Sequence, residues 1–150
     1  MIYVQYINNK IYSCLEKQKN SVIFGQNITL GSSLSGLGKK PKKINNKIKI
    51  FNTQNSENSL VGLGLGLMLS ETNCVFLTKQ QDFLLLSFDQ LVSTTNALID
   101  RKIKSFFNIF AIVVDHGYEG PQSCLNNSDD FYSISGIPIF NLNSKIEIDI

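Results

Sequence analysis

The pattern of apolar and polar residues alternates along the chain between a helical spacing and a strand spacing. Apolar residues three and four positions apart, such as Ile7 and Ile11, predict an amphipathic helix over residues 2–18. The same spacing predicts the clearest helix of the chain over residues 82–99. A shorter helix is expected at residues 129–135.

Short apolar or alternating runs between these segments predict strands at residues 22–24, 48–51, 74–77, 106–114 and 137–142. The run 106–114 is almost unbroken, which is typical of a central parallel strand covered on both faces. Because strands alternate with helices, the 150 residues predict one α/β domain. We expect a three-layer architecture, with an open, mostly parallel sheet and helices on both of its faces.

Residues 60–69 are ambiguous, because leucine and glycine alternate there as they would in a strand. The length of the segment and the strand that follows at residues 74–77 favour a helix. Each glycine inside a helix costs about 1 kcal/mol relative to alanine. We therefore interpret these glycines as positions where the helix lies close to the sheet. Their spacing differs from that of the dinucleotide-binding fingerprint, which argues against such a site.

Composition narrows the classes of function. A net charge of +2 gives no broad field for nucleic acid, and no apolar run reaches the roughly 18 residues that span a bilayer. The N-terminus lacks the features of a secretory signal, and three well-separated cysteines suit reduced thiols. A single histidine without a close cysteine pair argues against a structural zinc site. We expect a cytoplasmic protein that binds no nucleic acid, no membrane and no metal through its own side chains.

Residues 29–47 form a predicted flexible loop rich in glycine, serine and lysine. Its lysines surround Pro41, at positions Lys39, Lys40, Lys42 and Lys43. Such charge runs are usually solvated loops, which is the favoured interpretation. The alternative is an electrostatic contact with an acidic partner or a phosphate.

Polar residues follow several of the predicted strands. In open parallel sheets, ligands bind at the carboxyl ends of the strands, and Gln26, Glu57, residues 78–83 and His116 gather there by this logic. A carboxylate in the first turn of a helix usually only complements the helix dipole. A lone histidine at a strand end is more often a hydrogen-bonded structural residue than a catalytic base.

A longer pattern gives Glu57 more weight. The chain presents, in order, a strand, Thr53, Ser56-Glu57, Val61-Gly62, a helix of small residues, a strand, Asp82-Phe83 and Phe88-Asp89-Gln90. This order resembles the pyrimidine-binding domain of thiamine diphosphate-dependent enzymes, chiefly the β subunits of 2-oxo acid dehydrogenases, with transketolase further off. The resemblance extends over residues 22–142 and is sharp over residues 51–90. Gly120-Pro121-Gln122 is similar to the glycine-rich loop of that family.

The resemblance implies a role for several residues. Glu57 would hydrogen-bond a ring nitrogen of the aminopyrimidine of thiamine diphosphate, favouring the imino tautomer that takes the proton from the thiazolium carbon. Phe83 would wall the pyrimidine by stacking. Leu60, Gln26 and His116 are further candidates for the cofactor site. Phe88 is a weaker candidate for lining or packing.

The resemblance also implies partners. The family holds the diphosphate and Mg²⁺ with a GDG motif and a later asparagine, and this sequence contains no GDG. We therefore expect a separate diphosphate-binding (α-type) subunit to hold Mg²⁺ and to complete a heterotetramer. The chain alone is expected to form a homodimer, joined through the helices that begin near Glu57 and Asp82.

Three departures from the family pattern keep other functions open. Gln26-Asn27 replaces acidic residues, Gln122-Ser123 lacks the usual histidine, and Lys79-Gln80-Gln81 looks like a small insertion. One alternative is a catalytically degenerate homologue that acts as an assembly or regulatory partner. Another is a flavodoxin-like domain that binds a flavin or a nucleotide.

Overall fold

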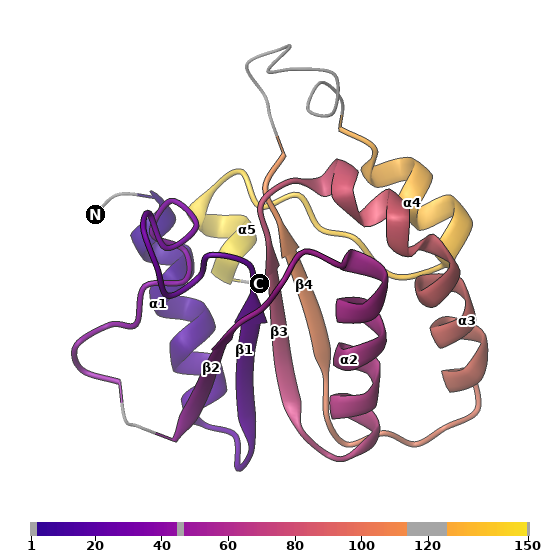
Figure 1. Cartoon of the computed structure of the whole chain (residues 1–150), viewed down its shortest axis with the longest axis horizontal. Coiled ribbons are helices and arrows are strands. Elements are labelled where there is room, and N and C mark those ends of the chain that lie inside the picture. The colour runs from indigo at the N-terminus through magenta and orange to yellow at the C-terminus, as the bar shows by residue number, and fades with distance from the viewer. Residues whose placement is uncertain (1–2, 45–46, 114–125, 150) are drawn as a thin grey trace.

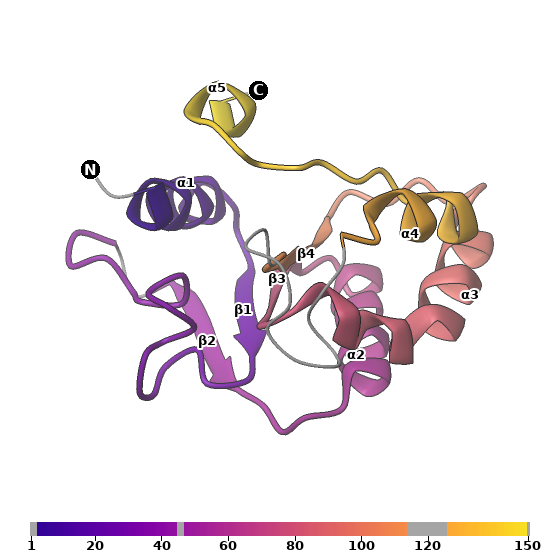
Figure 2. The same cartoon turned by 90° about the horizontal axis from the view of Figure 1, so that it is seen from above.

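A computed structural model describes residues 3–44, 47–113 and 126–149 of the chain (Figure 1). Its sheet contains four parallel strands in the order β2-β1-β3-β4. The strands are β1 (Ser21–Gly25), β2 (Ile48–Asn52), β3 (Asn73–Thr78) and β4 (Phe107–Ala111). Helices cover both faces, so the predicted three-layer α/β fold is confirmed (Figure 2). Within these ranges, no helix is long and apolar enough to cross a bilayer.

One face of the sheet is covered by α1 (Tyr3–Glu16) and by the short C-terminal helix α5 (Lys145–Asp149). Ile11 and Leu15 of α1 pack there against Ile23 and Val75 of the strands. The β1–β2 connection packs on the same face, with Leu34 and Leu37 buried.

Side chains of α1 hold this connection in place. The Asn8 amide donates hydrogen bonds to the carbonyl oxygens of Leu37 (2.6 Å) and Lys39 (2.9 Å). The Tyr12 hydroxyl donates to the carbonyl oxygen of Gly38 (3.0 Å). The segment predicted as a flexible loop is therefore anchored over residues 37–39, while the side chains of Lys42 and Lys43 stay exposed.

The opposite face carries four helical segments. They are α2 (Glu57–Leu69), the 3-10 helix η1 (Gln81–Ser87), α3 (Phe88–Leu98) and α4 (Ser128–Ser135). The rings of Phe24 and Phe76 stack here with centroids 5.3 Å apart, and Phe107 stacks on Phe24 at 6.3 Å. Val61 of α2 is completely buried on this layer.

Three expectations from the sequence were wrong. The helix predicted over residues 82–99 is split into η1 and α3, and the buried Ser87 hydroxyl donates to the carbonyl oxygen of Leu84 (2.7 Å) at the junction. Such a side-chain bond competes with regular helical hydrogen bonding. The strand predicted to be central, β4, lies at one edge of the described sheet. Residues 137–142 form no strand, and Pro138 removes one donor that a ladder would use.

The ambiguous segment 60–69 is helical, and Gly64 explains why glycine is needed there. A Cβ atom at Gly64 would overlap the ring of Phe107, whereas one at Gly66 would meet nothing within 4 Å. The thiol of Cys74 donates a weak hydrogen bond to the carbonyl oxygen of Gly64 (3.4 Å). Gly64 therefore lets α2 lie directly on β3 and β4.

Two alanine substitutions in α2 should shift stability in opposite directions. Gly64→Ala forces Phe107 or the helix to move, and we expect a loss of about 1–3 kcal/mol. Gly66→Ala gains helix propensity without a clash and should add about 0.5–1 kcal/mol. Urea unfolding of both variants measures the difference, and equal effects of the two would contradict the close contact.

Candidate functional site

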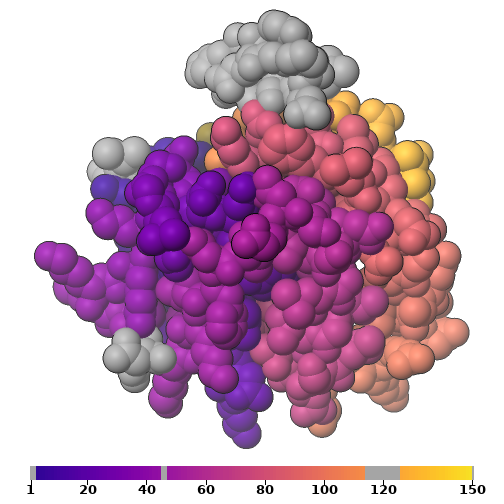
Figure 3. Space-filling model, in the orientation of Figure 1, coloured from indigo at the N-terminus to yellow at the C-terminus, as the bar shows by residue number. Residues whose placement is uncertain are grey.

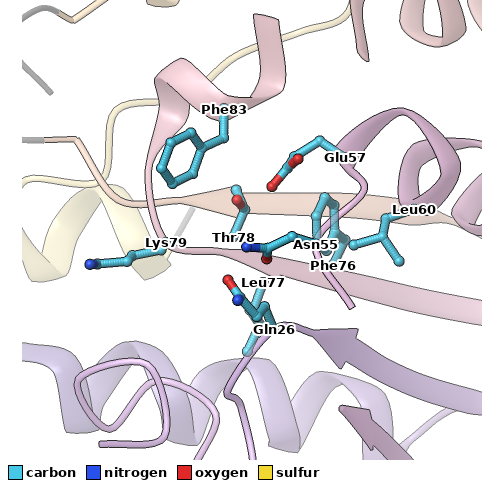
Figure 4. A pocket seen from close by; sticks show the side chains of 9 residues that line it. All are labelled: Gln26, Asn55, Glu57, Leu60, Phe76, Leu77, Thr78, Lys79 and Phe83. Atoms are coloured by element: carbon cyan, nitrogen blue, oxygen red, sulfur yellow. The ribbon is translucent and has the colours of Figure 1, made fainter. Parts of the chain in front are cut away.

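The carboxyl ends of β1 and β3 meet the first turns of α2 and η1 at one corner of the fold. Gln26 follows β1, and Thr78 ends β3. Glu57 is the first residue of α2, and Phe83 lies in η1. These four side chains line one narrow hollow (Figure 4). Parallel α/β sheets place their ligand sites at this end of the strands.

Local structure fixes where Glu57 lies. The backbone N–H of Thr53 donates to the carbonyl oxygen of Gly25 (3.0 Å), which extends the pairing of β1 and β2 by one residue. The chain then turns into α2, where Leu60 and Val61 are buried against the sheet. Because this side of α2 is packed on the sheet, Glu57 in the first turn of the helix lies at the edge formed by the carboxyl ends of the strands.

The Glu57 carboxylate is half-buried and makes no hydrogen bond or ion pair with any other described residue. Figure 4 shows it turned toward the space between Phe83 and Thr78, while the side chain of Lys79 points away. The N-cap Ser56 does not cap the helix, because its hydroxyl donates to the hydroxyl of Ser59 (2.9 Å). The carboxylate thus remains available to accept a hydrogen bond from a bound molecule.

An open groove lies outside the hollow and shares Glu57 and Phe83 with it. The inner hollow has a volume of about 10 Å³, room for about one water molecule. The groove has a volume of about 400 Å³ and also touches Asn55, Asn58 and Leu86. This volume lies within the range of about 300–1,000 Å³ found for small-molecule sites. Phe83 and Glu57 both line this groove.

The position of Phe83 depends on Gln81, which is buried at the start of η1. The Gln81 amide donates to the hydroxyl of Ser128 (2.9 Å), and its oxygen accepts from the backbone N–H of Asn127 (2.8 Å). The side chain of Asn127 donates in turn to the carboxylate of Asp82 (2.7 Å). These bonds join η1 to the start of α4.

From the sequence, Gln81 was expected at the carboxyl ends of the strands, within residues 78–83 and as part of a small insertion, but no role for its side chain was predicted. Its partners lie 46 and 47 residues further along the chain. No local pattern marks such a contact, because the polar residues that form it are unremarkable in both segments.

The structure brings together four of the predicted cofactor residues, Gln26, Glu57, Leu60 and Phe83. Phe88 lies elsewhere, since its ring stacks on Phe131 with centroids 4.5 Å apart. His116 and the segment Gly120-Pro121-Gln122 fall outside the described residues.

Other chemistry finds little support in the described ranges. Burial raises the pKa of the Cys74 thiol to about 12, so it stays neutral and is no nucleophile at neutral pH. Among residues 3–44, 47–113 and 126–149, no three His, Cys, Asp or Glu side chains gather closely enough to hold a metal ion. A comparison of the chain with models of known protein families finds no match.

Removing the Gln81 side chain should loosen the wall of the site. Gln81→Ala leaves the backbone N–H of Asn127 and the Ser128 hydroxyl without this partner, and we expect a loss of about 1–3 kcal/mol. Gln80→Ala is the matched control, because no side-chain cap bond is made by this neighbour. It should change stability by less than about 0.5 kcal/mol. Urea unfolding compares the two, and equal losses would count against the role of Gln81.

Proposed function

We propose that the chain is the pyrimidine-binding subunit of a split thiamine diphosphate-dependent enzyme that acts on a 2-oxo acid or a ketose. One observation carries the proposal: the half-buried Glu57 carboxylate, which has no hydrogen-bond partner among the described residues, lines a groove together with Phe83 at the carboxyl ends of the strands. The choice of thiamine diphosphate as the ligand comes from the order of sequence motifs around these two residues, which resembles that of pyrimidine-binding domains.

The residues of the groove suit an aminopyrimidine ring. Its face stacks on Phe83, and a protonated ring nitrogen or amino group donates to the Glu57 carboxylate. Asn55 adds polar atoms around the groove, and Thr78 lines the adjoining hollow. When bound, thiamine diphosphate supplies the nucleophilic carbon and the electron sink for chemistry at a carbonyl group. This chain orients the ring and exchanges a proton with it at Glu57.

The remaining half of the cofactor belongs to a second chain in this proposal. The sequence contains no GDG motif, so a diphosphate-binding (α-type) subunit holds the diphosphate and Mg²⁺. The surface of α2, which lies on the face seen in Figure 3, supports such an association. Its exposed positions Leu63, Gly66 and Leu69 carry no charge. Exposed apolar surfaces of this kind mark protein contacts. A helix that is apolar all round is normally buried.

Replacing the carboxylate tests the assigned chemistry. The chain is co-expressed with the product of the adjacent open reading frame, and cofactor-dependent turnover of 2-oxo acids is measured. Glu57→Gln should lower turnover by about 100-fold or more, because an amide cannot exchange the proton. Asp89→Asn, in the first turn of α3, is the matched control and should leave turnover unchanged. Full turnover in Glu57→Ala would refute the proposed role.

A second candidate function follows from Gln26, whose amide lines the hollow where an acid or base is expected from the family pattern. In this case the chain is a degenerate homologue that assembles or regulates a partner enzyme. The two candidates differ in the co-expression experiment, since a regulatory subunit forms the complex while Glu57→Gln leaves its activity intact. A melting temperature raised by a flavin or a nucleotide alone would instead favour the flavodoxin-like alternative.

The outward side of α2 should determine association. Leu63 is 46% exposed on this side, and Leu63→Glu places a charge in the proposed contact. We expect the dissociation constant of the homodimer or of the heterotetramer to rise by about tenfold or more. Leu30→Glu, at a leucine that is 64% exposed in the β1–β2 connection, is the control and should not change it. Sedimentation velocity over a concentration series measures both, and a wild-type chain that stays monomeric without and with its partner would contradict the contact.

A further inference from the structure

The outer edge of β4 is open among the described residues. Cys74 lies opposite Phe107 in the parallel ladder, and its N–H donates to the carbonyl oxygen of Phe106 (2.9 Å). In a parallel pair, alternate residues face the neighbouring strand, so the peptide groups of Phe107, Ile109 and Ala111 point away from β3. No hydrogen bond to these groups is present in the described part of the chain. Native proteins usually pair or cover such an apolar edge.

A segment able to pair with this edge follows α4. Gly136 ends α4 in the left-handed region (φ 68°), and residues 137–142 continue without secondary structure. Phe140 is 79% exposed, although Asn141 is the one polar side chain of the segment. Pro138 is compatible with an outermost strand, because the donor it lacks would face solvent. The N–H groups of Ile139 and Asn141 would then face β4, as would that of Ile137 once it leaves the Ser135 hydroxyl to which it now donates (3.2 Å).

The topology favours this arrangement. α3 connects β3 to β4 across one face of the sheet, and α4 packs against α3 on the same face. A strand that follows α4 beyond β4 would repeat that crossover with the same hand, which is the hand that parallel sheets adopt. Ile137 packs against the same buried cluster as Ile109 and Ala111 of β4.

Contacts at the C-terminal helix hold the segment in its present path. The Tyr6 hydroxyl donates to both oxygens of the Asp149 carboxylate (2.7 and 2.6 Å), which also forms an ion pair with Lys10. The ammonium of Lys145 lies 4.9 Å from the centroid of the Tyr6 ring. Since α4 and α5 lie on opposite faces, residues 137–144 must pass the outer edge of β4 (Figure 2).

These contacts are exposed and few. Lys10 and Asp149 are 43% and 45% exposed, and α5 buries no residue completely. Exposed ion pairs contribute little to stability. Hydrogen bonds from Lys10 and Tyr6 hold the pKa of the Asp149 carboxyl below its ordinary value, so the contact is present at neutral pH. Ile148 of α5 is only partly buried against the core beneath α1, so loss of the ion pair is expected to weaken the attachment of α5.

We propose that the outer edge of β4 is a docking edge for residues 137–141, which join the sheet as a fifth parallel strand when α5 separates from α1. The segment thus has two positions: across the edge, with α5 held on α1, or along the edge, with α5 free. This proposal is independent of the cofactor proposed above. It concerns α4 directly, because the start of α4 holds Gln81 and the end of α4 leads into the moving segment.

Amide hydrogen exchange followed by NMR on the full chain tests the proposal. Asp149→Asn removes the ion pair, and the amides of Phe107, Ile109 and Ala111 should exchange at least about tenfold more slowly than in the wild-type chain. Asp130→Asn makes the same charge change on an exposed part of α4 and should leave these rates unaltered. Unchanged or faster exchange in Asp149→Asn overturns the proposal. It would mean that releasing α5 only exposes β4 to solvent and adds no strand to its edge.

Proline substitutions identify which segment takes the edge. In the Asp149→Asn background, Ile139→Pro removes a donor that faces β4 and should abolish the added protection. Phe140→Pro removes a donor that faces solvent and should preserve it. Circular dichroism melts verify that both variants fold. The same response in both variants overturns the proposal. Amide protection that rises with protein concentration also overturns it, because the edge would then pair with a second copy of the chain.

Discussion

The contact between Gly64 and the ring of Phe107 sets the distance between α2 and the sheet, and the candidate site depends on that distance. A helix carrying alanine at this position would have to stand further from β4. Glu57 lies two turns earlier on the same rigid helix, so a shift of the helix moves its carboxylate as well. Glycine is therefore kept inside a helix, despite its low propensity, because the geometry of the groove needs close packing.

The two walls of the site are held in place by different interactions. Glu57 and Leu60 are carried by a helix whose inner side is buried. Phe83 lies on a 3-10 turn that is fixed mainly by the polar bonds of Gln81 to Asn127 and Ser128. Buried polar bonds of this kind specify one arrangement, since breaking them leaves unpaired groups in the interior. The aromatic wall is thus coupled to α4 through the Gln81 side chain, and to the end of β4 through the Gln81 N–H, which donates to the carbonyl oxygen of Ile112 (3.0 Å).

The order of strands and helices followed from the sequence because each of these segments has its own apolar spacing. Glu57, Phe83, Leu60 and Gln26 could be assigned to one corner for the same reason, since strand ends and helix starts converge in parallel sheets. The order of the strands in the sheet could not be predicted in this way. The apolar run of β4 indicates that the strand is buried, but it does not show which elements cover it. Gln81 was equally out of reach, because its partners are distant in sequence and ordinary in type.

The β1–β2 connection has one further consequence. Parallel strands normally need a crossover helix between them, yet residues 26–47 contain none among the described positions. The preceding helix, α1, takes that place from outside, and Asn8 and Tyr12 supply three hydrogen bonds to carbonyl oxygens of the crossing chain. Shortening the protein from its N-terminal side would accordingly strip those oxygens of their donors and uncover Leu34 and Leu37. The N-terminal helix α1 therefore replaces the crossover helix that a β-α-β unit would have between β1 and β2.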